Sequence, residues 1–274
     1  MKRAFQILTY ILAAIGLFFI LGYMAVYFGL TNTPGGADLG RRFRLEPSQI
    51  GQTKQLGWNE GEEWSTLKGA VEKDAKVINQ ASQVVGIDPR LLTSCLVVEQ
   101  LRLFYSEREV FKQVFSPLVI LGTQSQFSWG VMGMKPETAK LVEQYLKDPA
   151  SPYYLGTRYE HLLDFTTNNP DEERFTRLVD EHDHYWSYLY SAIYLKQLQT
   201  AWSKAGYSIN NNIGVTATLF NIGFNKSEPK KDPQVGGAII TINNVDYTFG
   251  SLAAQFYYSG ELLNDFPITN YSGL

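Results

Sequence analysis

The chain has 274 residues, of which 45% are hydrophobic and 19% are charged, so it is long and apolar enough to bury one sizeable core. The net charge of −3 and the isoelectric point near 5.7 give no sign of the basic patch that is typical of nucleic-acid-binding proteins. Cys95 is the single cysteine, which excludes an intramolecular disulfide.

The N-terminus predicts a membrane anchor. Residues 7–30 carry no charged side chain and follow Lys2 and Arg3. As a helix, this run would cross the roughly 30 Å of hydrocarbon in a bilayer. A cleaved signal peptide is the alternative, but its apolar region would be only about 7–15 residues long. We therefore expect residues 1–30 to form a single transmembrane helix, whose flanking basic residues do not decide its orientation.

Turn-forming and polar residues dominate 31–62, which is typical of a linker. The segment 63–85 then predicts an amphipathic helix that ends at Gly86. Asp88 and Pro89 supply an N-cap and a first-turn proline for the next helix. Further helical patterns lie at 106–116, 136–147, 172–204 (as two helices) and 211–222.

The segment 238–250 interrupts the helical periodicity. Its apolar residues alternate around Asn243-Asn244, which predicts a small β-hairpin. A last helix is expected over 251–266, before Pro267. We thus expect a mainly α protein. Its expected parts are an anchor, a linker, a helical domain and a C-terminal hairpin-helix extension, at residues 1–30, 31–62, 63–235 and 236–274.

The helix that begins at Pro89 has a glutamate on its expected apolar stripe. Helical steps from Leu92 lead through Leu96 to Glu99. One interpretation places Glu99 at the edge of the stripe, in an ion pair with Arg102 at i+3. The other buries it partly, which raises the pKa of its carboxyl and keeps it protonated near neutral pH. Such an acid can protonate the leaving oxygen of a glycosidic bond.

Three segments, in this order, resemble the signature segments of the lytic transglycosylases in the lysozyme-like superfamily. They are IDPRLLTSCLVVE at 87–99, SWGVMGMKPETAK at 128–140 and ATLFNIGFN at 217–225. The family patterns are D-P-x-L-L…E, S-x-G-x-M-Q-x-x-P-x-T-A and Y-N-x-G. The middle segment is the most specific, and its matching residues are Ser128, Gly130, Met132, Pro136, Thr138 and Ala139.

The resemblance implies a lysozyme-like helical fold and an enzyme that cleaves the β-1,4 bond between N-acetylmuramic acid and N-acetylglucosamine in peptidoglycan. Glu99 would act as acid and then as base on the sugar's 6-hydroxyl, which closes a 1,6-anhydro ring. The implied substrate-binding residues are Ser128, Gly130, Met132, Phe220, Asn221 and Gly223. No metal or cofactor is implied, since the substrate's acetamido group would stabilise the intermediate.

The implied partners are peptidoglycan strands and, through the anchor, the bacterial cytoplasmic membrane, with the catalytic domain on its outer side. The chain departs from the family pattern at three positions: Gln100 replaces a serine, Gly133 a glutamine and Phe220 a tyrosine. These departures leave open a non-enzymatic glycan-binding protein on the same fold.

Other polar residues allow further interpretations. A muramidase that admits water would need a second carboxylate, such as Glu107, although the segment 106–109 (SERE) resembles a capping box in which Glu109 bonds the helix start. The two histidines of 180–184 (DEHDH) would lie on different faces of a helix, which favours a solvated helix face over a metal site. Most aromatic residues of 185–194 are expected in the core, with one or two lining the glycan groove.

Overall fold

The computed structural model describes residues 56–106, 129–224 and 226–269, together with Gln6 and the helical residues 15–17. The chain divides after Arg42 into two compact units, and the elements below belong to the second. Among the described residues, no helix is both long and apolar enough to cross a membrane. Most of the expected anchor and linker lies outside the described residues, as does the helix expected beyond Ser106.

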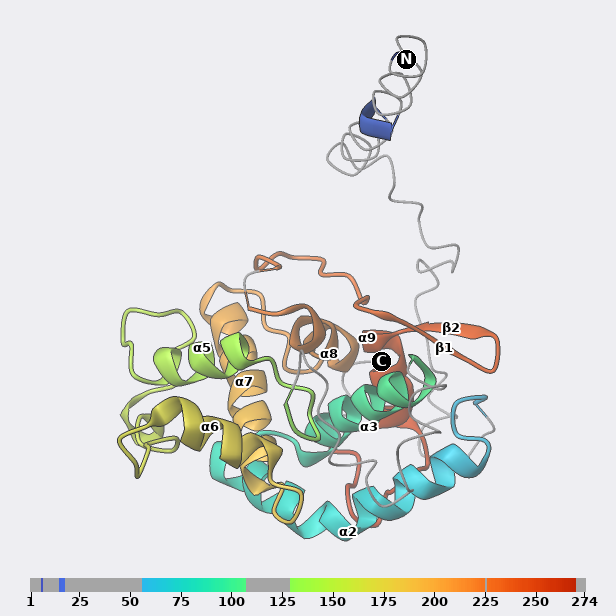
Figure 1. The fold of residues 1–274 in the computed structure, drawn as a ribbon, viewed down its shortest axis with the longest axis horizontal. Helices are drawn as coiled ribbons and strands as arrows, with labels where there is room; N and C mark the ends of the chain where they lie inside the picture. Colours follow the sequence, from blue (N-terminus) through green and yellow to red (C-terminus); the bar gives the residue numbers. More distant parts are fainter. Residues whose placement is uncertain (1–5, 7–14, 18–55, 107–128, 225, 270–274) are drawn as a thin grey trace. The chain divides into compact units, whose positions relative to one another are not determined.

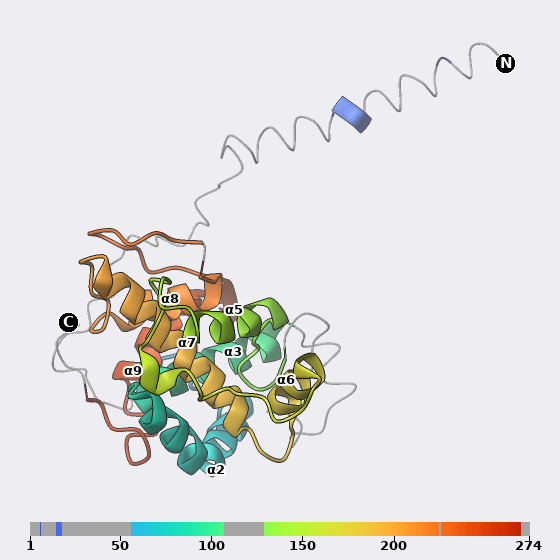
Figure 2. The same ribbon diagram turned by 90° about the vertical axis from the view of Figure 1, so that its left-hand side faces the viewer.

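The described part of the chain is mainly α-helical and has an antiparallel hairpin near the C-terminus, as the sequence predicts (Figures 1 and 2). In chain order its elements are α2 (Glu62–Val85), α3 (Pro89–Ser106), α5 (Pro136–Leu146), the 3₁₀ turn η3 (Thr157–Tyr159), α6 (Pro170–Val179), α7 (Tyr185–Lys204), α8 (Ile213–Ile222), β1 (Ile239–Ile242), β2 (Val245–Thr248) and α9 (Phe249–Tyr258).

Helix α2 is amphipathic, as predicted, and packs one face against α3 and α7. Its buried residues recur at helical spacing, as in Leu67, Val71 and Ile78. Gly86 ends the helix at φ 72°, a left-handed conformation that favours glycine, and its N–H bonds the carbonyl oxygen of Ser82.

The predicted stripe of α3 is buried, but the expectation of a single buried face was wrong, because most of the helix is buried on all sides. Each residue from Arg90 to Leu101 is buried, because α2, α7, α8, α9 and β1 all pack against this helix (Figure 1). The hydroxyls of Thr93 and Ser94 are satisfied by the carbonyl oxygens of Pro89 and Arg90 in the preceding turn. Burial of Glu99 therefore follows from the central position of the helix, and not from one apolar face.

The hairpin forms as predicted around Asn243 and Asn244, whose φ angles of 50° and 63° suit a type I′ turn. Ile240 pairs with Tyr247 across the two strands. The capping box of Thr248 and Ser251 then begins α9. Helix α9 packs against α3 and α8, so part of the segment expected as an extension contributes to the same core.

Helix α9 ends at Tyr258, so the prediction that it continues to residue 266 was wrong. The physical reason lies in Arg90, whose guanidinium is fully buried at the end of α9. It donates hydrogen bonds to the backbone carbonyl oxygens of Phe256, Tyr257, Ser259, Glu261 and Phe266. Carbonyl groups at a helix C-terminus carry partial negative charge, which suits a buried cation. Residues 261–265 accordingly form turns around this side chain.

Candidate functional site

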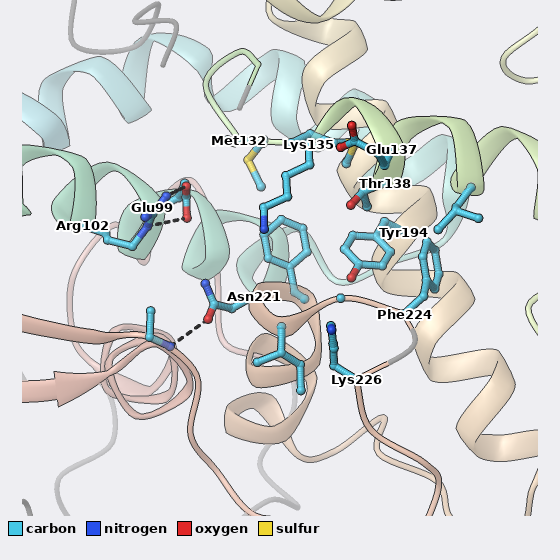
Figure 3. Close-up of a pocket in the computed structure, with 17 residues that line it drawn as sticks. Glu99, Arg102, Met132, Lys135, Glu137, Thr138, Tyr194, Asn221, Phe224 and Lys226 are labelled. Atoms are coloured by element: carbon cyan, nitrogen blue, oxygen red, sulfur yellow. Dashed lines mark hydrogen bonds and ion pairs between the residues drawn. The ribbon is translucent and has the colours of Figure 1, made fainter. Parts of the chain in front are cut away.

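A pocket of about 470 Å³ lies where the three sequence segments meet (Figure 3). Helix α3 contributes Glu99, and the loop before α5 contributes Met132 and Gly133. The last turn of α8 contributes Phe220 and Asn221, and Gly223 follows them. The structure thus brings together residues that lie more than a hundred positions apart in the sequence.

Glu99 is 4% exposed and bonds Arg102 through both carboxylate oxygens. Its Oε2 lies 3.2 Å from Nε of Arg102, and its Oε1 bonds Nη2. Burial raises the pKa of the Glu99 carboxyl above its usual value, whereas the hydrogen bond and charge of Arg102 and the charge of Lys135 act in the opposite direction. Each interpretation is confirmed in part, since Glu99 is buried, as the second expects, and is also paired with Arg102, as the first expects.

The loop before α5 is a tight turn. The backbone groups of Trp129 and Met134 bond each other at N–O distances of 2.8 and 3.0 Å. Gly130 lies outside the pocket lining: a Cβ there would be 2.0 Å from the carbonyl oxygen of Leu178 and 2.9 Å from Oγ of Ser187. Gly130 therefore allows the loop to pack closely against α6 and α7.

Gly133 faces the carboxylate of Glu99. A Cβ at this position would lie 2.2 Å from Oε1 and 2.7 Å from Cδ of Glu99, and the backbone has a φ of 59°. The carboxylate occupies the space that any side chain at 133 would need. This packing gives a physical reason for glycine where the family pattern has glutamine.

Gln100, the residue after Glu99 on α3, also holds this loop in place. It is 2% exposed, and its Nε2 donates a hydrogen bond to the carbonyl oxygen of Val131. The residue that replaces the family's serine therefore connects α3 to the loop. Glu99 and Gln100 together set the distance between the helix and the pocket wall.

Asn221 is held by its side-chain oxygen, which accepts a hydrogen bond from the N–H of Ala238 at 2.8 Å. Its amide nitrogen points toward Glu99 in Figure 3 and is therefore directed at the acid. Gly223 ends α8 at φ 104°, and its N–H bonds the carbonyl oxygen of Leu219. Because α8 ends here, Asn221 lies in its last turn, at the pocket.

Aromatic rings form one wall of the pocket. The ring of Phe220 lies with its centroid 5.3 Å from that of Tyr194 and 6.3 Å from that of Phe249. Tyr194 lines the pocket with its ring, and its hydroxyl donates to the carbonyl oxygen of Leu219 at 3.3 Å. Tyr188 and Tyr190 are instead fully buried in the core. The aromatic segment 185–194 thus contributes mainly to the core and one ring to the pocket.

Several further pocket residues were not identified from the sequence. Lys135 directly precedes Pro136 of the middle segment, and Lys226 follows the third segment. The signal that would have pointed to them is their position, since Lys135 lies within the middle segment and Lys226 directly after the third. Tyr194 of α7 belongs to the aromatic segment from which one or two groove residues were expected, and the tertiary structure decides that it is the one in the pocket lining.

Some candidates lie elsewhere. Ser128, Glu107 and Glu109 are outside the described residues. Residues 180–184 form a loop and not the expected helix face, because the carboxylate of Asp180 accepts the backbone N–H groups of His182 and Asp183. Within the described ranges, no group of three or more His, Cys, Asp or Glu side chains is placed to hold a metal ion.

The site thus combines a buried carboxyl of raised pKa, an amide directed toward it and an apolar wall, in a pocket large enough for part of a glycan. A carboxyl of raised pKa in a pocket is one of the groups that can act in general acid–base chemistry. Comparisons with models of protein families, with curated proteins and with solved structures find no match to this chain.

Proposed function

We propose that this protein is a peptidoglycan lytic transglycosylase with a lysozyme-like helical domain, and that Glu99 is its general acid and base. We further propose that residues 1–30 anchor it in the bacterial cytoplasmic membrane, with the domain on the outer side. One observation carries the proposal: the pocket where the three family-like segments converge contains the buried carboxyl of Glu99.

The raised pKa of Glu99 suits the first step, in which a protonated carboxyl gives its proton to the glycosidic oxygen as the bond to the anomeric carbon breaks. The ionised Glu99 then accepts the proton of the 6-hydroxyl, whose oxygen attacks the anomeric carbon and closes the 1,6-anhydro ring. The second step returns the carboxyl to its protonated form, so no water and no second protein carboxylate are consumed or needed.

Arg102 supports the second half of this cycle. Its ion pair with Glu99 favours the ionised carboxylate, which is the form that accepts the proton from the 6-hydroxyl. Burial favours the protonated form, which is needed first. The side chain of Arg102 is 32% exposed and lines the pocket, so the ion pair lies where the substrate would bind.

Two departures from the family pattern also fit an active enzyme. Gln100 holds the pocket loop through Val131, and Gly133 leaves room for the carboxylate of Glu99. Both replacements are therefore matched to the position of Glu99.

The test uses the full chain on purified peptidoglycan, with mass spectrometry of the released fragments. We expect fragments with 1,6-anhydro ends, and we expect Glu99→Gln to slow their release by about 10²- to 10⁴-fold because the proton donor is lost. Glu261→Gln is the matched control, since Glu261 is similarly buried at 5% exposure but lies outside the pocket lining. Circular dichroism checks that both variants are folded.

Other outcomes would overturn the proposal in different ways. Release of fragments with free reducing ends, dependent on Glu99, would identify a hydrolytic muramidase. Sedimentation of the protein with the cell wall, without release of any fragment, would identify a glycan-binding protein.

A further inference from the structure

Two lysine side chains enter the pocket from opposite sides. Lys135 stands at the N-cap of α5, and Lys226 lies beyond the end of α8. Both ammonium groups are directed into the pocket in Figure 3. Within the described part of the chain, neither ammonium forms a salt bridge or a side-chain hydrogen bond.

The charges that line the pocket are unbalanced. Glu99 and Arg102 neutralise each other in their ion pair. Glu137 is the other carboxylate in the lining, and in Figure 3 it lies at the edge of the pocket while the two lysines extend inward. The pocket therefore has a local excess of positive charge, although the whole chain has a net charge of −3.

The apolar wall beside the lysines strengthens this effect. The rings of Tyr194, Phe220 and Phe224 line the same pocket, and they exclude water from one side of it. Opposite charges attract more strongly where the surroundings are less polar than water. Lys135 and Lys226 are both exposed, so an anion reaches them from solvent, and the gain is confined to the side that the rings cover.

We propose that Lys135 and Lys226 bind a carboxylate of the substrate, so that the pocket selects an acidic glycan over a neutral one. This inference rests on the proposed function and narrows its substrate class. An ammonium group binds a carboxylate as a point charge with three N–H donors. A glycan built only of N-acetylglucosamine has no carboxylate to offer.

Peptidoglycan contains two sources of this group. Muramic acid has a free lactyl carboxylate once its peptide has been removed, and the peptide itself carries carboxylates while it is attached. Both sources present the same chemistry to the lysines, so the experiment has to include each of them.

The experiment measures binding by isothermal titration calorimetry, with the full chain carrying Glu99→Gln so that no glycan is cleaved. This background also removes the influence of Lys135 on the charge of Glu99. The ligands are peptide-free muramic-acid oligosaccharides, the same oligosaccharides with peptides attached, and an N-acetylglucosamine oligomer of equal length. Lys135→Gln and Lys226→Gln are compared with Lys230→Gln, an exposed lysine outside the pocket lining.

We expect each pocket variant to weaken binding of an acidic glycan about fivefold and to reduce its salt dependence, as the loss of one ion pair predicts. Lys135→Arg and Lys226→Arg should retain most of the affinity because they keep the charge. Lys230→Gln and the neutral oligomer should show no change. A loss confined to peptide-free strands identifies the lactyl carboxylate, and a loss confined to peptide-bearing strands identifies the peptide carboxylates; either supports the inference.

Unchanged affinity for both acidic glycans would overturn the inference and leave the proposed function standing if the wild type still cleaves peptidoglycan. An equal loss for the neutral oligomer would overturn it too, because the lysines would then support the pocket and not the recognition of charge. Failure of the parent protein to bind any of the glycans would overturn the proposed function together with the inference.

Discussion

Helix α3 buries two charged side chains, one at its N-terminus and one past its middle, and the protein compensates these two charges differently. At the N-terminal end, Arg90 is 0% exposed and donates hydrogen bonds to five backbone carbonyl groups from α9 and the turns after it. Further along the helix, Glu99 is 4% exposed, and among the described residues its carboxylate bonds Arg102 alone.

This difference separates a charge that stabilises the fold from the carboxyl that we propose to transfer a proton. Fixed backbone acceptors offset the cost of burying Arg90, so its charge contributes to the packing of α3 against α9. The single, partly exposed partner of Glu99 does not offset its burial, and the pKa of the carboxyl is raised as a result. A buried carboxyl with a raised pKa at a pocket is typical of proton transfer.

The largest expected effect is on stability, at the Arg90 end. We expect Arg90→Met to lower the free energy of unfolding by about 3–5 kcal/mol, because five buried carbonyl groups lose their donor. Urea unfolding measures the change. Arg158→Met, at an exposed arginine, should stay within about 0.5 kcal/mol of the wild type. Equal effects of the two variants would show that the carbonyl cluster does not stabilise the fold.

A smaller effect is expected at the Glu99 end, from Gly133→Ala. The added Cβ would displace the carboxylate of Glu99, and a displacement of about 1 Å can reduce a reaction rate by about a hundredfold. Gly206→Ala is the matched control, since Gly206 also has a positive φ, of 86°, but has no atom within 4 Å of an added Cβ. Both variants incur the cost of a left-handed alanine, about 1–2 kcal/mol.

Initial rates of release of 1,6-anhydro fragments, measured beside urea unfolding, distinguish the two consequences. A loss of activity in Gly133→Ala alone would confirm that residue 133 controls the position of Glu99. Similar activity of both variants would refute this role.

The smallest expected effect is a change in pH dependence from Arg102→Gln. Arg102 lowers the pKa of Glu99, so its removal leaves burial less opposed and the pKa rises further. The acid step needs the protonated carboxyl, so activity falls as the pH rises through this pKa. The alkaline limb of the rate–pH profile should therefore move to higher pH, whereas Arg158→Gln should not move it. A shift to lower pH would contradict the assignment of Glu99 as the acid.

The same pKa predicts how stability depends on pH. A carboxyl whose folded pKa is raised contributes stability that is present below its unfolded pKa and is lost as the pH rises through the folded pKa. In Arg102→Gln this loss should be larger and should extend to higher pH, because the ionised carboxylate has lost its partner. Urea unfolding of the wild type and of Arg102→Gln at a series of pH values measures this loss in the free energy of unfolding.

Much of the secondary structure follows from local signals in the sequence. Gly86 ends α2, Pro89 and Pro136 begin α3 and α5, and Asn243-Asn244 forms the hairpin turn. Each signal acts through the backbone dihedrals or caps of neighbouring residues, so no distant part of the chain is needed to interpret it. The length of α9 could not be predicted in this way, because its end depends on Arg90.

The sequence by itself thus determined the order of the elements, the hairpin, and Glu99, Met132, Phe220, Asn221 and Gly223 as residues of one candidate site. Only the tertiary structure decided that α3 is buried on all sides, that Gly133 faces Glu99, and that Lys135 and Lys226 enter the pocket. Dihedral preferences and caps act within about one helical turn, whereas burial and charge depend on side chains that folding brings together from distant parts of the chain.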